Sequence, residues 1–221
     1  MIYTVSQIQK IRSQLNVPGD KSISHRALIL NSIANGTSHI CNLSFGKDVI
    51  STIKCLKTLG VHISNAKNCP NIQTNCIEIV GKGLTGLTKP VKPLNAGNSG
   101  TTLRLLTGIL SGQNFSSIIF GDKSLNSRPM KRIIDPLIQM GAKIRGRHNN
   151  QFAPLEIEGT SLNPPNTIEL KVASAQVKSS IILASLISQK KSIIIDPFTT
   201  RNHTELMLKS MGVSISQNNS L

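Results

Sequence analysis

Aromatic side chains are scarce in this sequence: they make up 3% of its 221 residues, with no tryptophan and one tyrosine, Tyr3. Proteins that bind single-stranded nucleic acids need aromatic platforms on which the bases stack, so no nucleic-acid partner is expected. No apolar run approaches the roughly 18 residues of a membrane span, and the first residues lack a basic segment followed by an apolar one. We therefore expect no membrane partner and a cytoplasmic location.

The four cysteines form no CxxC pair and no ligand cluster with the five scattered histidines. This pattern predicts neither a zinc site nor a redox motif, so no metal is expected. In a reducing compartment the cysteines should be free thiols, either buried or at the surface. They are Cys41, Cys55, Cys69 and Cys76.

Acidic residues are few as well, since 10 Asp and Glu stand against 25 Lys and Arg and give a formal net charge of +15. This excess indicates an anionic partner: a nucleic acid, an acidic lipid, or a phosphorylated or carboxylated small molecule. AT-rich coding also enriches lysine, so the arginine positions carry more information than the lysine positions. With 38% hydrophobic and 16% charged residues, the chain is expected to be globular.

Three segments of the chain end alike, with apolar residues at helical spacing, then a glycine where a helix C-cap belongs, then a short β-like run. These segments are 55–63, 137–144 and 207–215, and their glycines are Gly60, Gly141 and Gly212. Upstream of each lies a second apolar helix that begins with Ser, Thr or Gly, at 22–36, 99–112 and 174–188. Predicted strands separate the paired helices, at 37–44, 116–122 and 191–198.

Further strands are predicted after the second helix in the first two units, so the repeating order is βαβαββ. Strands that alternate with helices in this way predict an α/β domain, here of three related units at about 19–90, 91–166 and 167–221. Only five residues, QNNSL, follow the last predicted element. The third repeat is therefore expected to be incomplete, either through truncation or because a shortened repeat caps the domain.

Because the units repeat, the first helix of each should point the same way and bring three helix N-termini to one region. The preceding segments, VPGDKS, LNAGNSG and VASAQ, are rich in small residues, and the free N–H groups and positive dipole of a helix N-terminus favour anions. Arginine can clamp a carboxylate or phosphate with two hydrogen bonds. A small, multiply charged anion is the expected ligand of the nearby cations Lys21, Arg26, Lys178, Arg128 and Arg201.

Each of these residues also has an ordinary structural interpretation. Lys21 and Arg26 can be solvated surface charges, and Ser174 can serve only as a helix cap. Arg104 lies in the middle of a predicted helix and can simply be exposed. Individually these residues are ambiguous, but their equivalent positions in three repeats favour a shared site.

Two segments resemble phosphate-binding loops, but neither predicts a nucleotide site. GKGLTG (81–86) matches GxGxxG after a predicted strand, but Pro90 and Pro93 exclude the helix that a dinucleotide site needs. GNSGTT (97–102) resembles a phosphate loop but lacks its GK[ST] ending, so ATP hydrolysis is not predicted. The sequence also assigns no catalytic triad of nucleophile, base and acid.

Five stretches, in order along nearly the whole chain, resemble the amino-terminal half of the 5-enolpyruvylshikimate-3-phosphate (EPSP) synthase family: VPGDKSISHRA, AGNSGTTLRLL, GDKSLNSRPM, SAQVKSS and TRNHTE. The resemblance implies transfer of the enolpyruvyl group of phosphoenolpyruvate to the 5-hydroxyl of shikimate 3-phosphate, with release of phosphate. This reaction belongs to the shikimate pathway of aromatic amino-acid biosynthesis, and no cofactor is expected. The enolpyruvyl transferase fold has two domains, each of three βαβαββ units in an inside-out α/β barrel, which close on the substrates.

By the same resemblance, residues 19–221 supply one of these two domains and the second domain is absent. Residues 1–18 resemble the segment that packs with the second domain in the family. The family's main proton-transfer group belongs to the absent half, and loss of a general acid or base costs roughly 100- to 10,000-fold in rate. We therefore expect negligible activity from this chain alone, unless a separate C-terminal half chain joins it.

The matching motifs also imply which residues of this sequence contact the substrates. The implied contacts to shikimate 3-phosphate are Lys21, Ser22, Arg26, Ser174, Gln176 and Arg201. The implied contacts to phosphoenolpyruvate are Lys21, Asn98, Gly100, Thr101, Arg128 and Gln176. Lys21 is also the implied catalytic residue of this half. The sequence departs from the family at Asn202, where Asp is usual, and at Thr200, where Ser is usual.

Three alternatives remain at this point. A UDP-N-acetylglucosamine enolpyruvyl transferase shares the fold and chemistry, but Lys-Asn is expected there in place of Lys21 and Ser22. A non-catalytic remnant would retain only the anion-binding half. A basic nucleic-acid binder would show steep salt dependence and little preference among small anions.

Overall fold

The computed structural model describes residues 3–4, 6–7, 10, 17–66 and 76–217. Within these residues the elements are α1 (Lys21–Ser32), β1 (Thr37–Ile40), α2 (Lys47–Thr58), β2 (His62–Asn65), β3 (Ile77–Val80), β4 (Leu94–Asn95), α3 (Gly100–Leu110), β5 (Ser116–Phe120), α4 (Lys123–Asn126), α5 (Lys131–Gln139), β6 (Lys143–Gly146), α6 (Arg147–Asn150), β7 (Phe152–Glu158), β8 (Thr167–Glu169), α7 (Ala175–Ser188), β9 (Ile193–Ile195) and α8 (His203–Ser210). The predicted role of residues 1–18 lies mostly outside the described residues and stays a prediction.

The middle unit contains the full predicted order, because β4, α3, β5, α5, β6 and β7 follow one another with two short helices, α4 and α6, added. The first unit has α1, β1, α2, β2 and β3 in the same order, and the third has β8, α7, β9 and α8. The expected α/β class is thus present. Loop 81–90 contains no helix, which agrees with the rejection of a dinucleotide motif there.

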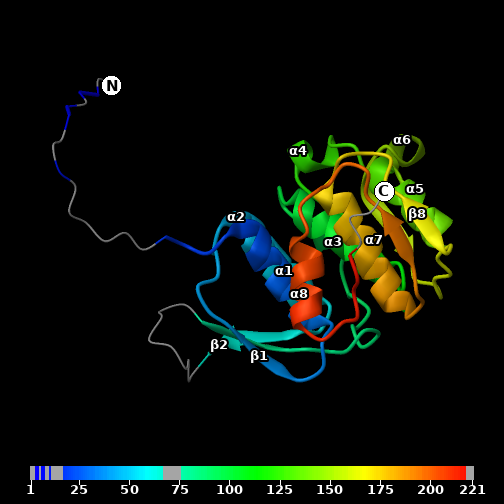
Figure 1. The fold of residues 1–221 in the computed structure, drawn as a ribbon, viewed down its shortest axis with the longest axis horizontal. Helices are drawn as coiled ribbons and strands as arrows, with labels where there is room; N and C mark the ends of the chain where they lie inside the picture. The colour runs from blue at the N-terminus through cyan, green and yellow to red at the C-terminus, as the bar shows by residue number, and fades with distance from the viewer. Residues whose placement is uncertain (1–2, 5, 8–9, 11–16, 67–75, 218–221) are drawn as a thin grey trace.

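The strands form three separate sheets, with the orders β1-β3-β2, β4-β5-β7-β6 and β8-β9. β4 pairs with β5 and β8 with β9 in parallel, and the other pairs are antiparallel. Helices α1, α3 and α7 run side by side through the body in Figure 1, and α3 contacts both neighbours. All residues of α3 except Thr101 are buried, whereas the exposed and buried residues of β5 and β7 alternate. Helices therefore fill the interior and each sheet exposes one face.

The three predicted helix-ending glycines adopt one shared geometry. Gly60, Gly141 and Gly212 have φ angles of +83°, +89° and +87°, a left-handed conformation that glycine adopts without steric cost. In each unit the amide after the glycine donates to a leucine carbonyl five residues back, at 3.0 Å. This is the Schellman arrangement, which satisfies carbonyls that a helix end leaves free. The same hydrogen bond at three equivalent positions supports the repeat derived from the sequence.

Helices α3 and α7 pack closely because a glycine and a serine meet between them. A Cβ atom on Gly108 would lie 2.3 Å from the carbonyl oxygen of Ser180, so a larger residue would force the helices apart. The Ser180 hydroxyl donates to the Arg104 carbonyl at 2.9 Å and adds a polar link between the helices. This close approach brings the first turns of α3 and α7 together.

One expectation about the cysteines is wrong. Cys41 and Cys76 form a disulfide, because they extend the antiparallel β1–β3 ladder by one position beyond the pair Ile40 and Ile77. Cys55 is a buried free thiol, as expected, and burial raises its pKa to about 12. Cys69 lies outside the described residues.

Candidate anion-binding site

Three helix N-termini, those of α1, α3 and α7, form the candidate site. A side chain caps each one: Asp20, Ser99 and Ser174 accept the backbone N–H of the residue three positions on, at 2.7, 3.1 and 3.4 Å. The predicted capping role of Ser174 is thus present, while α1 uses Asp20 rather than a serine. Side-chain hydrogen bonds between the helices, described next, hold the first turns together.

Arg26 on α1 is 5% exposed, so the interpretation of this residue as a solvated charge is wrong. Its guanidinium donates to the Thr204 hydroxyl at 2.8 Å, the Ser179 hydroxyl at 3.0 Å and the Ser22 carbonyl at 3.1 Å. All three acceptors are neutral. Burial lowers the pKa of Arg26, and the positive charge of Arg201 lowers it further. The charges of Glu205 and Asp20 act in the opposite direction and raise it. Arg26 therefore joins α1 to α7 and α8 and, among the described residues, forms no ion pair with a carboxylate.

Arg104 on α3 is 7% exposed, so the expectation that it lies on the surface is also wrong. It donates to Gln176 Oε1 at 2.6 Å, and Gln176 Nε2 in turn donates to the Thr101 hydroxyl at 2.9 Å. These bonds orient the Gln176 amide. A Cβ atom on Gly100 would lie 2.6 Å from Arg104 Nη1, so a larger residue here would displace the Arg104 guanidinium. Burial lowers the pKa of Arg104 to about 10, with contributions from other cations, among them Arg128.

Asn98 and Arg128 meet in front of the N-terminus of α3. The Asn98 side-chain oxygen accepts a short hydrogen bond from Arg128, and its Nδ2 donates to Asp122 at 2.7 Å. The hydrogen bond from Asn98 makes the largest contribution to lowering the pKa of the Asp122 carboxyl. Backbone hydrogen bonds and the charge of Arg128 lower it further. Two predicted phosphoenolpyruvate contacts are thus in direct contact with each other.

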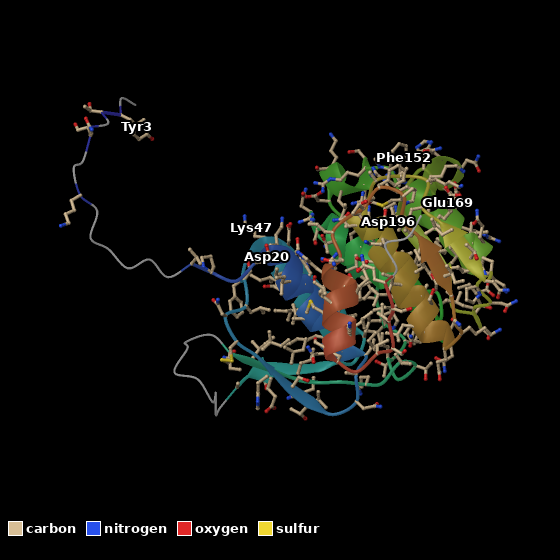
Figure 2. The ribbon with its side chains drawn as sticks, in the orientation of Figure 1. Tyr3, Asp20, Lys47, Phe152, Glu169 and Asp196 are labelled. Atoms are coloured by element: carbon tan, nitrogen blue, oxygen red, sulfur yellow. A yellow bond between two sulfur atoms is a disulfide. The ribbon has the colours of Figure 1, made fainter. Side chains whose placement is uncertain are left out.

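Lys21 and Ser22 occupy the first turn of α1. Lys21 is exposed and its ammonium lies 3.0 Å from Asp48 Oδ2 at the start of α2. Asp20, the N-cap of α1, and Lys47, the first residue of α2, lie at the same end of the molecule in Figure 2. Lys21 is therefore held at this end by one ion pair and remains accessible to solvent.

Arg201 is exposed on the segment between β9 and α8, and its charge acts on Arg26. Lys178, expected among the anion-binding cations, instead contacts two carboxylates: Asp196 at 2.9 Å and Glu205 at 2.8 Å. Its charge is thus neutralised within the chain. Asn202 precedes α8 but makes no side-chain capping bond.

A buried hydroxyl chain beneath the site was missed by sequence reasoning. His25 Nδ1 is 2.7 Å from the Thr52 hydroxyl, which is 2.6 Å from the Thr102 hydroxyl. Thr102 donates to the Ser99 cap at 2.7 Å. His25 has no exposed surface, and burial lowers its pKa from 6.5 to about 4. Neutral His25 thus connects α1 through α2 to the N-terminus of α3.

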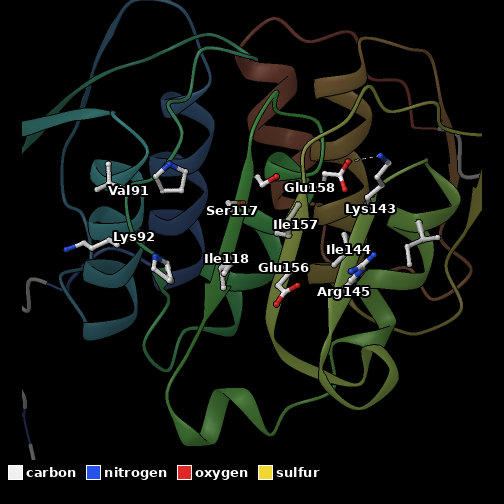
Figure 3. Close-up of a pocket in the computed structure, with 15 residues that line it drawn as sticks. Val91, Lys92, Ser117, Ile118, Lys143, Ile144, Arg145, Glu156, Ile157 and Glu158 are labelled. Atoms are coloured by element: carbon white, nitrogen blue, oxygen red, sulfur yellow. Dashed lines mark hydrogen bonds and ion pairs between the residues drawn. The ribbon is translucent and has the colours of Figure 1, made fainter.

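A cavity of about 680 Å³ lies on the outer face of the four-stranded sheet and is lined by different elements from the site. In Figure 3 Lys143 pairs with Glu158 at 2.7 Å, and Lys92 lies apart from this pair on the other side of the pocket. Arg145 is opposite Glu156 in the strand register. Carboxylates and paired cations do not suit an anion. The helix N-termini with Arg26 remain the better candidate.

The described residues contain no group of three or more His, Cys, Asp or Glu side chains that could hold a metal ion. They also contain no helix with the length and apolar character needed to cross a membrane. The cytoplasmic location stays a prediction. The site consists of hydrogen-bond donors and cations, and this chemistry fits small phosphorylated or carboxylated ligands.

Comparisons with known proteins agree with this chemistry. The 3-phosphoshikimate 1-carboxyvinyltransferase of Pelotomaculum thermopropionicum is 46% identical over 96% of this chain and 47% of its own length. That of Thermoanaerobacter sp. strain X514 is 49% identical over 94% of this chain and 47% of its own length. The structure of EPSP synthase from Acinetobacter baumannii superposes with a TM-score of 0.84 at 40% identity, over 93% of this chain and 45% of that chain.

The chain therefore spans about half the length of the curated relatives it matches. The family model for EPSP synthase (3-phosphoshikimate 1-carboxyvinyltransferase) matches residues 5–221, nearly the whole chain. With relatives above 40% identity and a superposing structure, this match shows that the chain belongs to the EPSP synthase family.

Proposed function

We propose that this chain binds shikimate 3-phosphate and phosphoenolpyruvate and contributes half of the site that transfers the enolpyruvyl group between them. The observation that carries the proposal is a pair of buried arginines, Arg26 and Arg104, beside three helix N-termini. Among the described residues neither arginine forms an ion pair with a carboxylate. Buried charges are usually paired, so two buried arginines without an ion pair, close to three helix N-termini, favour an anionic ligand.

The proposed division of the site follows the two groups of contacts. Shikimate 3-phosphate would lie against α1, α7 and the segment before α8, at Lys21, Ser22, Arg26, Ser174, Gln176 and Arg201. Phosphoenolpyruvate would lie against α3, at Lys21, Asn98, Gly100, Thr101, Arg128 and Gln176. Gln176 lies between the groups because its amide bonds to both α3 residues Arg104 and Thr101.

The proposed reaction is an addition followed by an elimination. The 5-hydroxyl of shikimate 3-phosphate gives up its proton to a base as its oxygen bonds to C2 of phosphoenolpyruvate, while a proton adds to C3. Phosphate then leaves C2 as a proton is lost from C3, and the enolpyruvyl ether remains. Lys21 is the proposed catalytic residue of this half, because its ammonium is exposed at the end where α1 and α3 begin. There it would act on the charge of the departing phosphate.

We also propose that residues 19–221 form one enolpyruvyl transferase domain, with units at about 19–90, 91–166 and 167–221. Because the chain spans about half the length of its relatives, we propose that turnover needs the other half of the family length. A separate chain carrying that half is the proposed partner. A non-catalytic anion-binding protein would bind the substrates without ever turning them over.

Calorimetric titration with shikimate 3-phosphate tests the proposed site, with shikimate and UDP-N-acetylglucosamine as control ligands at two salt concentrations. We expect saturable binding to shikimate 3-phosphate alone. Arg201→Ala should weaken it roughly 10- to 100-fold, as expected for a hydrogen bond to a charged group. The matched control Arg145→Ala removes an arginine from the outer sheet face and should leave the affinity unchanged. Absence of binding by the folded chain would refute the site.

A second experiment tests the reaction. Phosphate release from both substrates is measured for the chain alone and after mixing with the purified carboxy-terminal half of a family member. We expect release only in the mixture. Release by the chain alone at the rate of a full-length family member would refute the need for the other half. Binding without release in the mixture would favour the non-catalytic alternative.

A further inference from the structure

Lys178 on α7 has an unusual environment for a lysine. It is 6% exposed, and its ammonium contacts three acceptors: Asp196 Oδ2 at 2.9 Å, Glu205 Oε1 at 2.8 Å and the Thr200 carbonyl at 3.0 Å. An ammonium has three N–H donors, so each of them is used. Two of the acceptors, Asp196 and Thr200, lie in the segment between β9 and α8, and the third, Glu205, lies in α8. Lys178 therefore joins this segment and α8 to α7.

The segment 196–202 depends on this contact for its shape. Asp196 accepts hydrogen bonds from the amide of Phe198 at 3.2 Å and from the amide and hydroxyl of Thr200 at 2.9 and 2.7 Å. Thr199 has a φ of +50°, a left-handed conformation that a β-branched residue rarely adopts. Such a conformation persists where the surroundings hold it. The hydrogen bonds that Asp196 and Lys178 form with the residues before and after Thr199 hold it in this conformation.

The residue after this anchored turn is Arg201. It is exposed, yet its charge contributes to the lowered pKa of Arg26, so the two guanidinium groups lie close enough to repel each other. Arg201 directly follows Thr200, whose carbonyl accepts from Lys178 and whose amide and hydroxyl donate to Asp196. We propose that Lys178 is a positioning residue, which anchors segment 196–202 so that Arg201 faces the shikimate 3-phosphate site next to Arg26. The inference rests on the proposed function and deepens it.

The position of Glu205 explains why the anchoring side chain carries a positive charge. Its Oε1 contacts Lys178, while its Oε2 is buried without a hydrogen-bond partner. Without the ammonium, Asp196 and Glu205 would leave two largely buried carboxylates without their shared cation. The segment would then have to move to hydrate them, and Arg201 would move with it. Lys178 thus acts on the ligand through Arg201 and touches no ligand itself.

Two measurements test this inference on the whole chain. The first is hydrogen exchange, by mass spectrometry, of the peptide that contains the Thr200 amide. The second is the dissociation constant for shikimate 3-phosphate in a double-mutant cycle of Lys178→Met and Arg201→Ala. Lys171→Met is the matched control, because Lys171 pairs with Glu169 in the same unit but is exposed. Asp196→Asn removes the carboxylate that pairs with Lys178. It replaces Lys178→Met in both measurements if Lys178→Met does not fold.

We expect Lys178→Met to speed exchange of the peptide at least about tenfold and to weaken binding by roughly tenfold, whereas Lys171→Met changes neither. The double variant should bind like Arg201→Ala within about twofold, because a displaced arginine and a deleted one are equivalent. Additive losses, or wild-type affinity and exchange in Lys178→Met, would overturn the inference. If the wild-type chain does not bind shikimate 3-phosphate, the proposed function fails. The exchange measurement then tests the anchor alone: faster exchange in Lys178→Met supports it, and unchanged exchange overturns it.

Discussion

Acid should destabilise this protein through a single buried histidine. His25 has no exposed surface, and its pKa is about 4 in the folded chain against 6.5 in an unfolded one. Between these values the unfolded state binds more protons, so stability rises with pH. The contribution is complete above pH 6.5 and is lost as the pH falls towards 4. A difference of this size corresponds to about 3 kcal/mol of unfolding free energy.

Urea unfolding followed by circular dichroism between pH 4 and 7, at constant ionic strength, measures this loss. Carboxylates also titrate in this range, so the relevant quantity is the difference between the wild type and His25→Gln, which has no titrating ring. We expect the wild type to lose about 3 kcal/mol more than the variant across this range. The control His62→Gln removes an exposed histidine and should keep the wild-type dependence. Equal pH dependence in His25→Gln and the wild type would refute a buried, neutral His25.

Three further predictions concern the disulfide, the helix contact and the anion site. Thiol titration of the unfolded chain should find two fewer thiols before reduction than after it, and equal numbers would exclude the Cys41–Cys76 bond. Gly108→Ala should cost roughly 1 to 3 kcal/mol of unfolding free energy in urea titrations, because its Cβ would meet the Ser180 carbonyl. Arg128→Ala should weaken phosphoenolpyruvate binding roughly 10-fold or more in calorimetry, and undiminished affinity would remove Arg128 from the site.

The repeat could be predicted from the sequence because the residues that end its helices are determined by local backbone conformation. A left-handed C′ position selects glycine through the conformation of a single residue, so Gly60, Gly141 and Gly212 mark equivalent helix ends whatever packs around them. The helices that precede the glycines bury apolar faces at regular spacing, and that spacing is visible without a structure. These helix ends predicted an α/β fold of repeating units. The strand predicted after Gly212 is not present, because the described residues 213–217 form no strand.

The errors concern contacts between residues distant in sequence. Arg104 occupies a helix position that is compatible with solvent, and the packing of α3 against α7, together with the Pro129 carbonyl that accepts from its guanidinium, buries it. The Cys41–Cys76 disulfide spans 35 residues and depends on the β1–β3 register, which spacing alone does not determine. Lys178 was grouped with the anion-binding cations because sequence shows its charge but not its two carboxylate partners.

The repeat also explains why positive charge accumulates at one end of the domain. Each unit places its first helix in the interior in the same direction, so three positive dipole ends gather where α1, α3 and α7 begin. Burial lowers the pKa of Arg26 and of Arg104, and other arginines lower both further: Arg201 that of Arg26, and Arg132 and Arg128 that of Arg104. Mutual repulsion of this kind opposes folding, and a bound anion between the cations would relieve it. A site that contributed only to stability would pair these charges with carboxylates, as the same chain does for Lys178.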